Sequence, residues 1–230
     1  MLKQLKPEWI LIKMYKVSIG ICCYKQKQWL FRCLRSMARQ TFPMSEFEVI
    51  IVNDEPGIDL SEICNSMKDV LNIRLIENEK NLGLPASLNK ILNVSRGQYF
   101  VRVDADDYVS KHFLYLMSIF LDMNRNYQAI ACDYKKVNEI GLGLGIFSSI
   151  NEPIACGIMF TYESLCEINF YNEKYKMREG HELLKRYKEK YKIYNVEIPL
   201  YRYRIHGNNR TNNKKTLEKY DNMLDKNTKK

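Results

Sequence analysis

Three aspartates follow an apolar segment in the middle of the chain. Residues 97–103 are mostly apolar, and Asp104, Asp106 and Asp107 come directly after them. If the chain is extended here, Asp104 and Asp106 project to the same side, because side chains two residues apart in a strand share a face. Neighbouring carboxylates repel each other unless a cation offsets their charge, and oxygen ligands of this kind suit Mg²⁺ or Mn²⁺. The pattern therefore indicates a metal site at a strand end, or else a solvated acidic turn.

Alternating strands and helices must position these acids. Apolar segments predict strands, and apolar residues at helical spacing predict the helices between them. The expected strands are residues 17–24, 47–52, 73–76 and 99–103, and the expected helices lie at residues 29–37, 60–70 and 85–94. This order implies a parallel sheet with right-handed crossovers. Tyr24, Asp54 and Asp104 would then gather at the carboxyl edge of the sheet, where ligands bind in open α/β folds.

The second half of the chain has a less regular pattern. A strand is expected at residues 129–134, and the glycines within residues 141–145 then predict a flexible loop. The further expected elements are a strand at 157–160, a helical turn at 162–166, a helix at 179–190 and extended segments at 193–198 and 200–204, which Pro199 separates. We interpret this half as an extension that packs on the first half.

Composition is that of an ordinary globular protein. Of the 230 residues, 46% are apolar and 27% are charged, and no stretch of apolar residues is long enough to span a bilayer. The first ten residues contain charges and a proline where a signal peptide needs a continuous apolar stretch. Seven cysteines without C-x-x-C spacing predict neither a disulfide framework nor a zinc site. We therefore expect a cytoplasmic protein.

The chain is basic, with a formal net charge of +9 from 36 Lys and Arg against 27 Asp and Glu. Part of the excess lies in a basic tail at residues 212–230. Such a tail is either a solvated end or a peripheral contact with anionic lipid at the inner membrane face or with a phosphorylated substrate. The other basic residues are scattered and the tyrosines form no recognisable nucleic-acid module, so no nucleic-acid partner is expected.

Several short blocks in a fixed order resemble the family 2 glycosyltransferases, which have the GT-A fold. The blocks are residues 17–24, 40–42, 47–54, 81–89, 96–107, 178–186 and 200–206. Each block is weakly specific, but their ordered recurrence is specific. The resemblance implies an α/β fold with a Rossmann-like, mostly parallel sheet flanked by helices. It divides the chain into an N-terminal segment 1–14, a nucleotide-sugar-binding half 15–140, an acceptor-side half 141–211 of the same domain and the tail 212–230.

The resemblance also assigns residues to a donor site. Cys23 and Tyr24 match the end of the family's first strand, which lies near the nucleotide base. Asp54 matches an acid that binds the edge of uracil, so the donor is expected to be a UDP-sugar. The same blocks place four further residues at the donor site, namely Asn81, Gly83, Asn89 and Ala105.

The metal is likewise assigned through the resemblance. Asp104 is expected near the ribose, Asp106 on a Mn²⁺ or Mg²⁺ ion that bridges the diphosphate, and His206 closing over that metal. A metal held by carboxylates acts as a Lewis acid that stabilises the departing nucleoside diphosphate. The acceptor hydroxyl attacks from the opposite face of the sugar, which predicts inversion at the anomeric carbon, and a carboxylate must remove its proton.

The general base is the main departure from the family pattern. The family's Glu-Asp pair, whose acid serves as the base, is Glu179-Gly180 in this chain, and Glu182 follows. Leu88 also replaces an arginine that many members place near the nucleotide. Residues 179 and 182 share a helix face, so either glutamate could reach the acceptor, or both could be solvent-facing charges. Glu182 is preferred because it adjoins His181, and Glu179 is kept as the alternative.

These observations lead to one functional hypothesis with two alternatives. The chain is expected to be a metal-dependent, inverting glycosyltransferase that moves a sugar from a UDP-sugar to a glycan or lipid-linked glycan in cell-surface polysaccharide synthesis. A non-catalytic nucleotide-sugar-binding scaffold would explain Gly180 and Leu88. A basic nucleic-acid-binding α/β domain would explain the net charge of +9.

Overall fold

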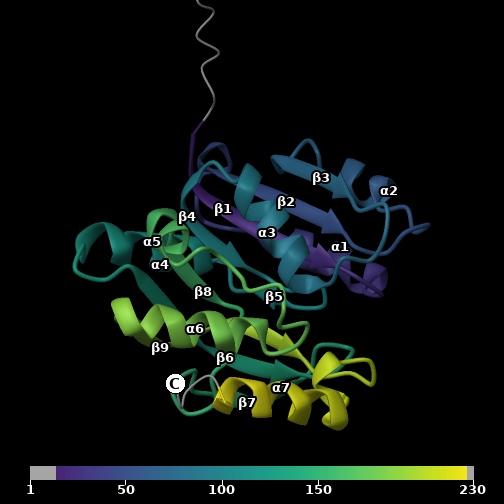
Figure 1. The fold of residues 1–230 in the computed structure, drawn as a ribbon. Helices are drawn as coiled ribbons and strands as arrows, with labels where there is room; N and C mark the ends of the chain where they lie inside the picture. Colours follow the sequence, from purple (N-terminus) through teal and green to yellow (C-terminus); the bar gives the residue numbers. More distant parts are fainter. Residues whose placement is uncertain (1–13, 227–230) are drawn as a thin grey trace, which may run out of the picture.

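The computed structural model describes residues 14–226, so the predicted N-terminal segment 1–14 lies almost wholly outside the described residues. The first half of the sheet is parallel, with strands in the order β3-β2-β1-β4 (Figure 1). These strands are β1 (Tyr15–Cys23), β2 (Phe47–Asn53), β3 (Ile73–Glu77) and β4 (Gly97–Arg102). All four strands point the same way, so their carboxyl ends meet at one edge, as the strand–helix alternation predicts.

Helices cover both faces of this sheet because its central strand is apolar on both sides. Every residue of β2 is buried, and its successive side chains point to opposite faces. Val49 packs in a core cluster with the helices on one face, and Ile50 packs in the cluster on the other face. The first face is covered by α1 (Lys27–Met37) and α4 (Phe113–Met123), and the second by α3 (Leu84–Val94), α5 (Tyr162–Glu167) and α6 (Glu179–Lys190).

The second half of the chain extends the same sheet beyond β4. Its strands are β5 (Tyr108–Val109), β6 (Ala129–Val137), β7 (Gly143–Phe147), β8 (Ile158–Thr161) and β9 (Ile193–Arg204). β8 pairs antiparallel with both β4 and β6, whereas β6 and β9 are parallel. In the described residues the result is one mixed sheet of nine strands, flanked by helices. The predicted α/β architecture is confirmed, with a parallel half and a mixed half.

Three local expectations are wrong. The loop expected at residues 141–145 is largely strand, because β7 pairs with β6 across a register shift that accommodates the glycines. The extended segments around Pro199 form one strand, β9, and the register with β6 shifts beside that proline. The helix expected at residues 60–70 is reduced to α2 (Ser61–Asn65), because residues 66–70 close turns with bonds such as Val70 N–H to the Met67 carbonyl, at 3.1 Å.

The end of the described chain is helical. Helix α7 (Lys214–Lys226) lies within the segment interpreted as a basic tail, and its Tyr220 is buried against Tyr175, with ring centroids 6.2 Å apart. The guanidinium of Arg178 binds the carboxylate of Asp221 through both oxygens, at 2.7 and 3.0 Å. These contacts join α7 to the start of α6. Among the described residues, none of the helices has the length and hydrophobicity needed to cross a membrane.

Candidate active site

A cleft of about 1100 Å³ opens at the carboxyl edge of the parallel strands. It is bounded by residues that follow β1, β2 and β4, and by the segments 153–156, 176–181 and 203–213. Eight of the predicted site residues line it: Tyr24, Asp54, Asn81, Gly83, Asp104, Asp106, Glu179 and His206. The acids predicted from the end of β4 therefore face a space large enough for a nucleotide sugar.

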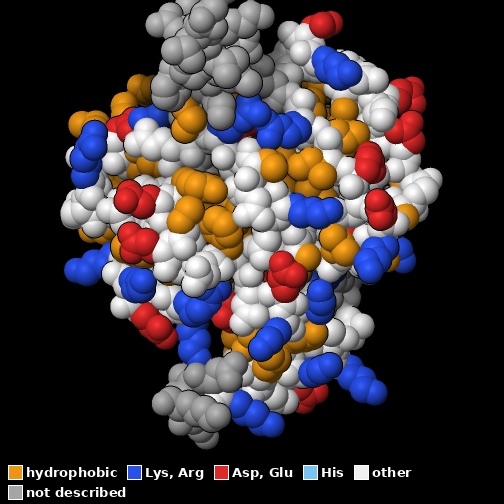
Figure 2. All heavy atoms as spheres, turned by 45° about the horizontal axis from the view of Figure 1, so that its top comes forward, with side chains coloured by type: hydrophobic (Ala, Val, Ile, Leu, Met, Phe, Trp, Pro, Cys, Tyr) orange, Lys and Arg blue, Asp and Glu red, His pale blue; other side chains and the backbone are white. Residues whose placement is uncertain are grey.

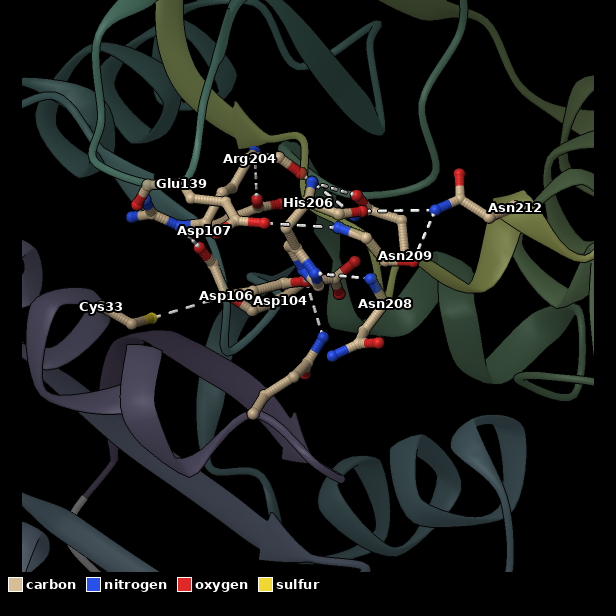
Figure 3. A network of polar contacts seen from close by, with 12 residues as sticks. Cys33, Asp104, Asp106, Asp107, Glu139, Arg204, His206, Asn208, Asn209 and Asn212 are labelled. Atoms are coloured by element: carbon tan, nitrogen blue, oxygen red, sulfur yellow. Dashed lines mark hydrogen bonds and ion pairs between the residues drawn. The ribbon is translucent and has the colours of Figure 1, made fainter.

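Asp106 and His206 meet in this cleft although they are a hundred residues apart (Figure 3). The imidazole Nε2 lies 2.9 Å from Asp106 Oδ2, and Gln26 Nε2 donates to the same oxygen at 2.6 Å. His206 Nδ1 accepts a hydrogen bond from the backbone N–H of Asn208 at 3.2 Å, so the Nε2 of a neutral ring holds the proton that faces Asp106. The ring also packs on Trp29, 5.9 Å between centroids.

Burial sets the electrostatics of the acidic motif. Asp106 is 6% exposed, and its pKa is raised first by burial and then by the nearby charge of Asp104, while the hydrogen bond from His206 lowers it. A divalent cation at this carboxylate would favour its ionised form. The pKa of Asp107 is raised well above its ordinary value, again mainly by burial.

Asp107 serves the framework. Its Oδ2 accepts a hydrogen bond from the hydroxyl of Tyr201 at 2.7 Å, and its Oδ1 accepts the backbone N–H of Arg204, also at 2.7 Å. The Arg204 guanidinium donates to the backbone carbonyl of Asp106 at 2.7 Å and stacks 4.3 Å from the centre of the Trp29 ring. The acidic turn is therefore bound to β9 on one side and to α1 on the other.

Arg102 connects the acidic motif to the start of α6. Its guanidinium binds Asp104 through both oxygens, at 2.6 and 3.0 Å, and its Nη1 donates to Glu179 Oε1 at 3.0 Å. Arg102 is 6% exposed and Glu179 is 5% exposed. The two carboxylates raise the pKa of Arg102 well above its ordinary value, against the effect of burial. The second oxygen of Glu179 lies 4.0 Å from Arg210 Nη1, on the wall of the cleft.

Asp54 organises the loop that enters α3. Its carboxylate accepts hydrogen bonds from the backbone N–H groups of Leu82 and Gly83, at 2.8 and 2.9 Å. It also accepts hydrogen bonds from the side-chain amides of Asn78 and Asn81, at 2.8 and 3.2 Å. Gly83 has φ of +85°, a backbone conformation that glycine adopts without strain, directly before the helix. The predicted uracil contact of Asp54 remains a prediction, and the structure adds this structural role.

The residues at the cleft suit a hard divalent cation. Asp106 and His206 converge, and Asp104 lies on the same wall. His206 would bind a cation through Nε2 in the tautomer that carries its proton on Nδ1. A second group of atoms, from Asp104, Asp107 and Cys156, lies within 4.8 Å of one another. Both oxygens of Asp107 are occupied by protein donors, however, and burial raises the pKa of the Cys156 thiol well above its ordinary value. The pair Asp106 and His206 is therefore the better-placed candidate for the metal.

Four predicted site residues do not line the cleft. Glu182 is 7% exposed and binds Arg186 through both oxygens, at 2.8 Å each, so the structure does not bring the preferred general base to the site. Cys23 and Ala105 are buried in the core cluster. Asn89 bridges α3 to the backbone of Tyr171 with hydrogen bonds of 2.9 and 3.0 Å.

Close packing explains the glycine in the predicted Glu-Asp position. A Cβ atom on Gly180 would lie 2.1 Å from the Cβ of Ala155, which is an overlap. Ala155 belongs to the segment 153–156, which lines the cleft beside the start of α6. The sequence reasoning missed this contact, and it also missed Gln26 and Arg204 as partners of the acidic turn. For Arg204 the only signal was its place in the block 200–206, which contains a second arginine, Arg202.

Comparisons with known proteins agree with this geometry. The sequence model of the family described as "Glycosyl transferase family 2" matches residues 18–217. The chain is 30% identical to the poly(ribitol-phosphate) beta-N-acetylglucosaminyltransferase TarS of Staphylococcus aureus over 135 residues. This alignment covers 58% of this chain and 23% of that protein. The chain is 28% identical over 216 residues to an uncharacterized glycosyltransferase of Haemophilus influenzae, covering 84% of this chain and 66% of that protein. The chain thus spans about a quarter of the length of TarS.

Solved structures show the same fold. The S. aureus TarS fragment 1-349 in complex with UDP-GlcNAc superposes with a TM-score of 0.74 at 22% identity, over 86% of this chain and 61% of that chain. A mannosyltransferase from Pyrobaculum calidifontis, in complex with GDP-Man and Mn²⁺, superposes with a TM-score of 0.67 at 15% identity, over 85% and 58% of the chains. The family match over most of the chain and the shared GT-A fold confirm the resemblance in the motifs: this chain belongs to glycosyltransferase family 2.

Proposed function

We propose that the protein transfers a hexose-type sugar from a UDP-sugar to a hydroxyl of a glycan acceptor, with inversion at the anomeric carbon. One observation supports this most strongly: Asp104, Asp106, His206 and Glu179 line a single cleft at the carboxyl edge of the sheet. The set contains groups for a metal-bound diphosphate and a carboxylate for the acceptor. The related TarS fragment was solved with UDP-GlcNAc, which favours a uridine donor.

Asp106 and His206 would hold the metal, Mn²⁺ or Mg²⁺. When bound, it supplies Lewis-acid stabilisation to the departing nucleoside diphosphate. Gln26 orients the Asp106 carboxylate through its hydrogen bond of 2.6 Å, and the ring of Trp29 packs against the imidazole. The Mn²⁺ in the related mannosyltransferase complex supports this proposal. The chain's own contribution is a carboxylate and an imidazole that protein contacts hold in place.

Glu179 is the general base of the proposed mechanism. Arg102 holds its Oε1 at 3.0 Å, which leaves Oε2 on the cleft wall to accept the proton of the acceptor hydroxyl. Because the same guanidinium binds Asp104 through both oxygens, Arg102 fixes the distance between the donor-side acid and the base. Glu182 instead neutralises Arg186, which binds backbone carbonyls of residues 168 and 170.

The acceptor is proposed to be a glycan or lipid-linked glycan of a cell-surface polysaccharide, and the site of action the cytoplasm. The support is the similarity to TarS, whose name describes transfer to poly(ribitol phosphate). A second relative, from Bacillus spizizenii, is a poly(ribitol-phosphate) beta-glucosyltransferase that is 29% identical over 141 residues. Polymer-modifying relatives therefore favour a polyhydroxylated polymer over a small-molecule acceptor.

A non-catalytic binding scaffold is the second candidate, and Gly180 is the observation that favours it. Because Ala155 occupies the space beside Gly180, no side chain at this position could act as a base without movement of the backbone. The nucleic-acid alternative has weaker support. Lys and Arg side chains are dispersed among acidic and apolar ones over the face shown in Figure 2.

The test is transfer by the purified full chain, with Mn²⁺, a panel of nucleotide sugars and polymeric acceptors. A first screen measures thermal stability with each donor, because a ligand at a hundred times its dissociation constant stabilises by about 2.7 kcal/mol. UDP-sugars should stabilise the protein in the presence of Mn²⁺ more than GDP- or CDP-sugars. Donor binding with no transfer to any acceptor would favour the scaffold, and steep salt-dependent binding to RNA or DNA without donor binding would favour the third alternative.

A further inference from the structure

The hairpin of β6 and β7 exposes an unusual concentration of aliphatic side chains. Five large ones within eleven residues are strongly exposed: Ile140 at 73%, Leu142 at 61%, Leu144 at 53%, Ile146 at 61% and Ile150 at 64%. Large exposed apolar side chains elsewhere in the described chain are dispersed among several elements. Scattered apolar side chains are normal on a protein surface, but a contiguous apolar patch marks an interaction site.

Backbone geometry places these side chains at the margin of the sheet. β7 pairs only with β6 in the described residues, so its other edge has no strand partner (Figure 1). The register shifts in this hairpin, where Val137 faces Gly143 and Lys136 faces Gly145, so Leu144 is an extra residue in β7. Bulges of this kind are a way in which proteins protect an exposed strand edge from pairing with another strand. The patch therefore presents side chains more readily than backbone hydrogen bonds.

Cationic side chains border the same patch. Ile146 stands directly opposite Lys135 on β6, and Lys135 stands opposite Arg202 on β9, so these three residues share one face of the sheet. Arg202 faces Tyr108 on β5, and Arg32 stacks on that tyrosine ring at 4.3 Å. Arg32 also donates to the backbone carbonyl of Ile140 at 3.1 Å, which brings its charge to the hairpin turn.

No carboxylate among the described residues forms an ion pair with Arg32, Lys135 or Arg202. Cations without a carboxylate partner, beside exposed aliphatic groups, complement one surface in particular. The aliphatic groups can enter the interfacial region of a bilayer, and the cations can bind anionic headgroups. A polyanion such as RNA would use the cations but leave the five aliphatic side chains in water.

We propose that this surface, the hairpin face, docks on a membrane containing anionic lipid. The hairpin face consists of Ile140, Leu142, Leu144, Ile146 and Ile150 with Arg32, Lys135 and Arg202. It differs from the basic tail, to which the sequence pattern assigned a lipid contact. The hairpin also touches the acidic turn: Arg204, which binds the Asp106 carbonyl, donates to the backbone carbonyls of Asn138 and Glu139.

The proposal is tested by co-sedimentation of the full chain with vesicles, a measurement that does not depend on transferase activity. The two vesicle types are phosphatidylcholine alone and phosphatidylcholine mixed with phosphatidylglycerol. We expect binding to the mixed vesicles only, weakened by added salt. The double variant Leu144→Ser/Ile146→Ser should reduce the partition coefficient by about tenfold or more. Each substitution removes most of an aliphatic side chain that would be buried in the bilayer. Lys135→Gln should reduce it by about fivefold.

Matched control variants distinguish an effect of the hairpin face on vesicle binding from a general effect of lost hydrophobicity or charge. Val70→Ser/Met123→Ser removes two aliphatic side chains that are 48% and 77% exposed on other elements, and it should leave vesicle binding unchanged. Lys68→Gln is the corresponding control for charge. All variants should unfold at the temperature of the parent, because Leu144 and Ile146 are exposed and Lys135 is only half-buried.

Three results would overturn the proposal. The first is equal binding of parent and Leu144→Ser/Ile146→Ser to the mixed vesicles, and the second is no binding by the parent. The third is a parent dimer in analytical ultracentrifugation that this double variant converts to monomer, without vesicle binding, which would assign the face to a second copy of the chain. None of these results bears on transfer itself, so failure here and failure of the proposed function can be told apart.

Discussion

The carboxylate of Asp106 accepts hydrogen bonds from two side chains that come from opposite ends of the sequence, Gln26 and His206. Its backbone is held separately, by Arg204. Because the turn is fixed by contacts that do not involve the Asp106 charge, this side chain can be altered without loss of the fold. Residues of this kind allow binding and catalysis to be tested apart from stability.

Asp106→Asn should lower the rate of sugar transfer by roughly 10²-fold or more, because the amide removes the negative charge that holds the metal beside the diphosphate. Its melting temperature should stay close to that of the parent. The measurement is turnover with Mn²⁺ at saturating donor. Glu189→Gln, which removes an exposed charge at the far end of α6, is the control. Near-normal turnover of Asp106→Asn would exclude this residue as the metal ligand.

The two candidate bases are separated by a pair of matched variants. Glu179→Gln should reduce transfer by roughly 10²–10⁴ while UDP affinity is unchanged, because a base acts on the acceptor and not on the donor. Glu182→Gln should leave the chemical step intact and lower stability by about 1.5–3 kcal/mol, because it breaks a two-point ion pair with Arg186. Transfer rates, UDP calorimetry and thermal melts of both variants show which glutamate is the base. A larger loss of rate at Glu182 would restore the preference that sequence alone suggests.

At the scale of elements, α6 and the loop before α3 are the parts that place the site. Helix α6 starts at Glu179 after Arg178, which has a left-handed φ of +64°, and it approaches the 153–156 segment so closely that only glycine fits at 180. The loop before α3 is folded around one buried carboxylate, that of Asp54. Each element yields a prediction.

Gly180→Ala should destabilise the protein by about 1–3 kcal/mol, because the new methyl group overlaps the Cβ of Ala155 and forces α6 away from the cleft wall. The higher helix propensity of alanine, worth about 1 kcal/mol, would offset only part of this. Gly143→Ala is the control, since no atom outside its own neighbours lies within 4 Å of the added Cβ. Chemical denaturation of both variants measures the difference. Equal stability of the two variants would mean that small shifts of the backbone remove the overlap between residue 180 and Ala155.

Asp54→Ala should weaken UDP binding by an amount equivalent to about 1.5–3 kcal/mol, and it should loosen the loop that the carboxylate holds. Calorimetry with UDP measures the first effect. Hydrogen exchange of the Leu82 and Gly83 amides, whose N–H groups bind Asp54 at 2.8 and 2.9 Å, measures the second. Faster exchange with unchanged UDP affinity would leave Asp54 with its structural role and remove it from the donor site.

At the scale of the whole molecule, stability should depend on the protonation of His181. Burial and the neighbouring Arg178 lower the pKa of this histidine from its ordinary value of 6.5. The unfolded chain therefore binds more protons than the folded protein as pH falls through about 6.5, so the free energy of unfolding should decrease there. His181→Asn should make this decrease shallower, and His112→Asn serves as the control. Thermal melts at about pH 7.5 and about pH 5.5 provide the measurement. Identical pH dependence in parent and His181→Asn would contradict the prediction.

Much of the fold follows from local patterns. The strands at 17–24, 47–52 and 99–103 are apolar and bounded by polar residues, and the edge at which they end depends only on their being parallel. The glycines of residues 141–145 and Pro199 wrongly predict a loop and a break between two strands. Turn propensity is a local preference, and the backbone hydrogen bonds formed by pairing with β6 outweigh that preference. The short helix α2 ends earlier than its apolar pattern indicates, because residues 66–70 form turns instead.

The sequence by itself determined the family, the parallel half of the sheet and the edge at which Asp54, Asp104 and Asp106 stand, because these depend on neighbours along the chain and on an ordered set of motifs. Only the tertiary structure decided how distant side chains are paired. It placed Glu179 on the cleft through Arg102, turned Glu182 to Arg186, and brought His206 to Asp106. Two glutamates three residues apart on one helix are equivalent in spacing. They differ only in what packs against that helix, and this is settled by contacts between segments far apart in the chain.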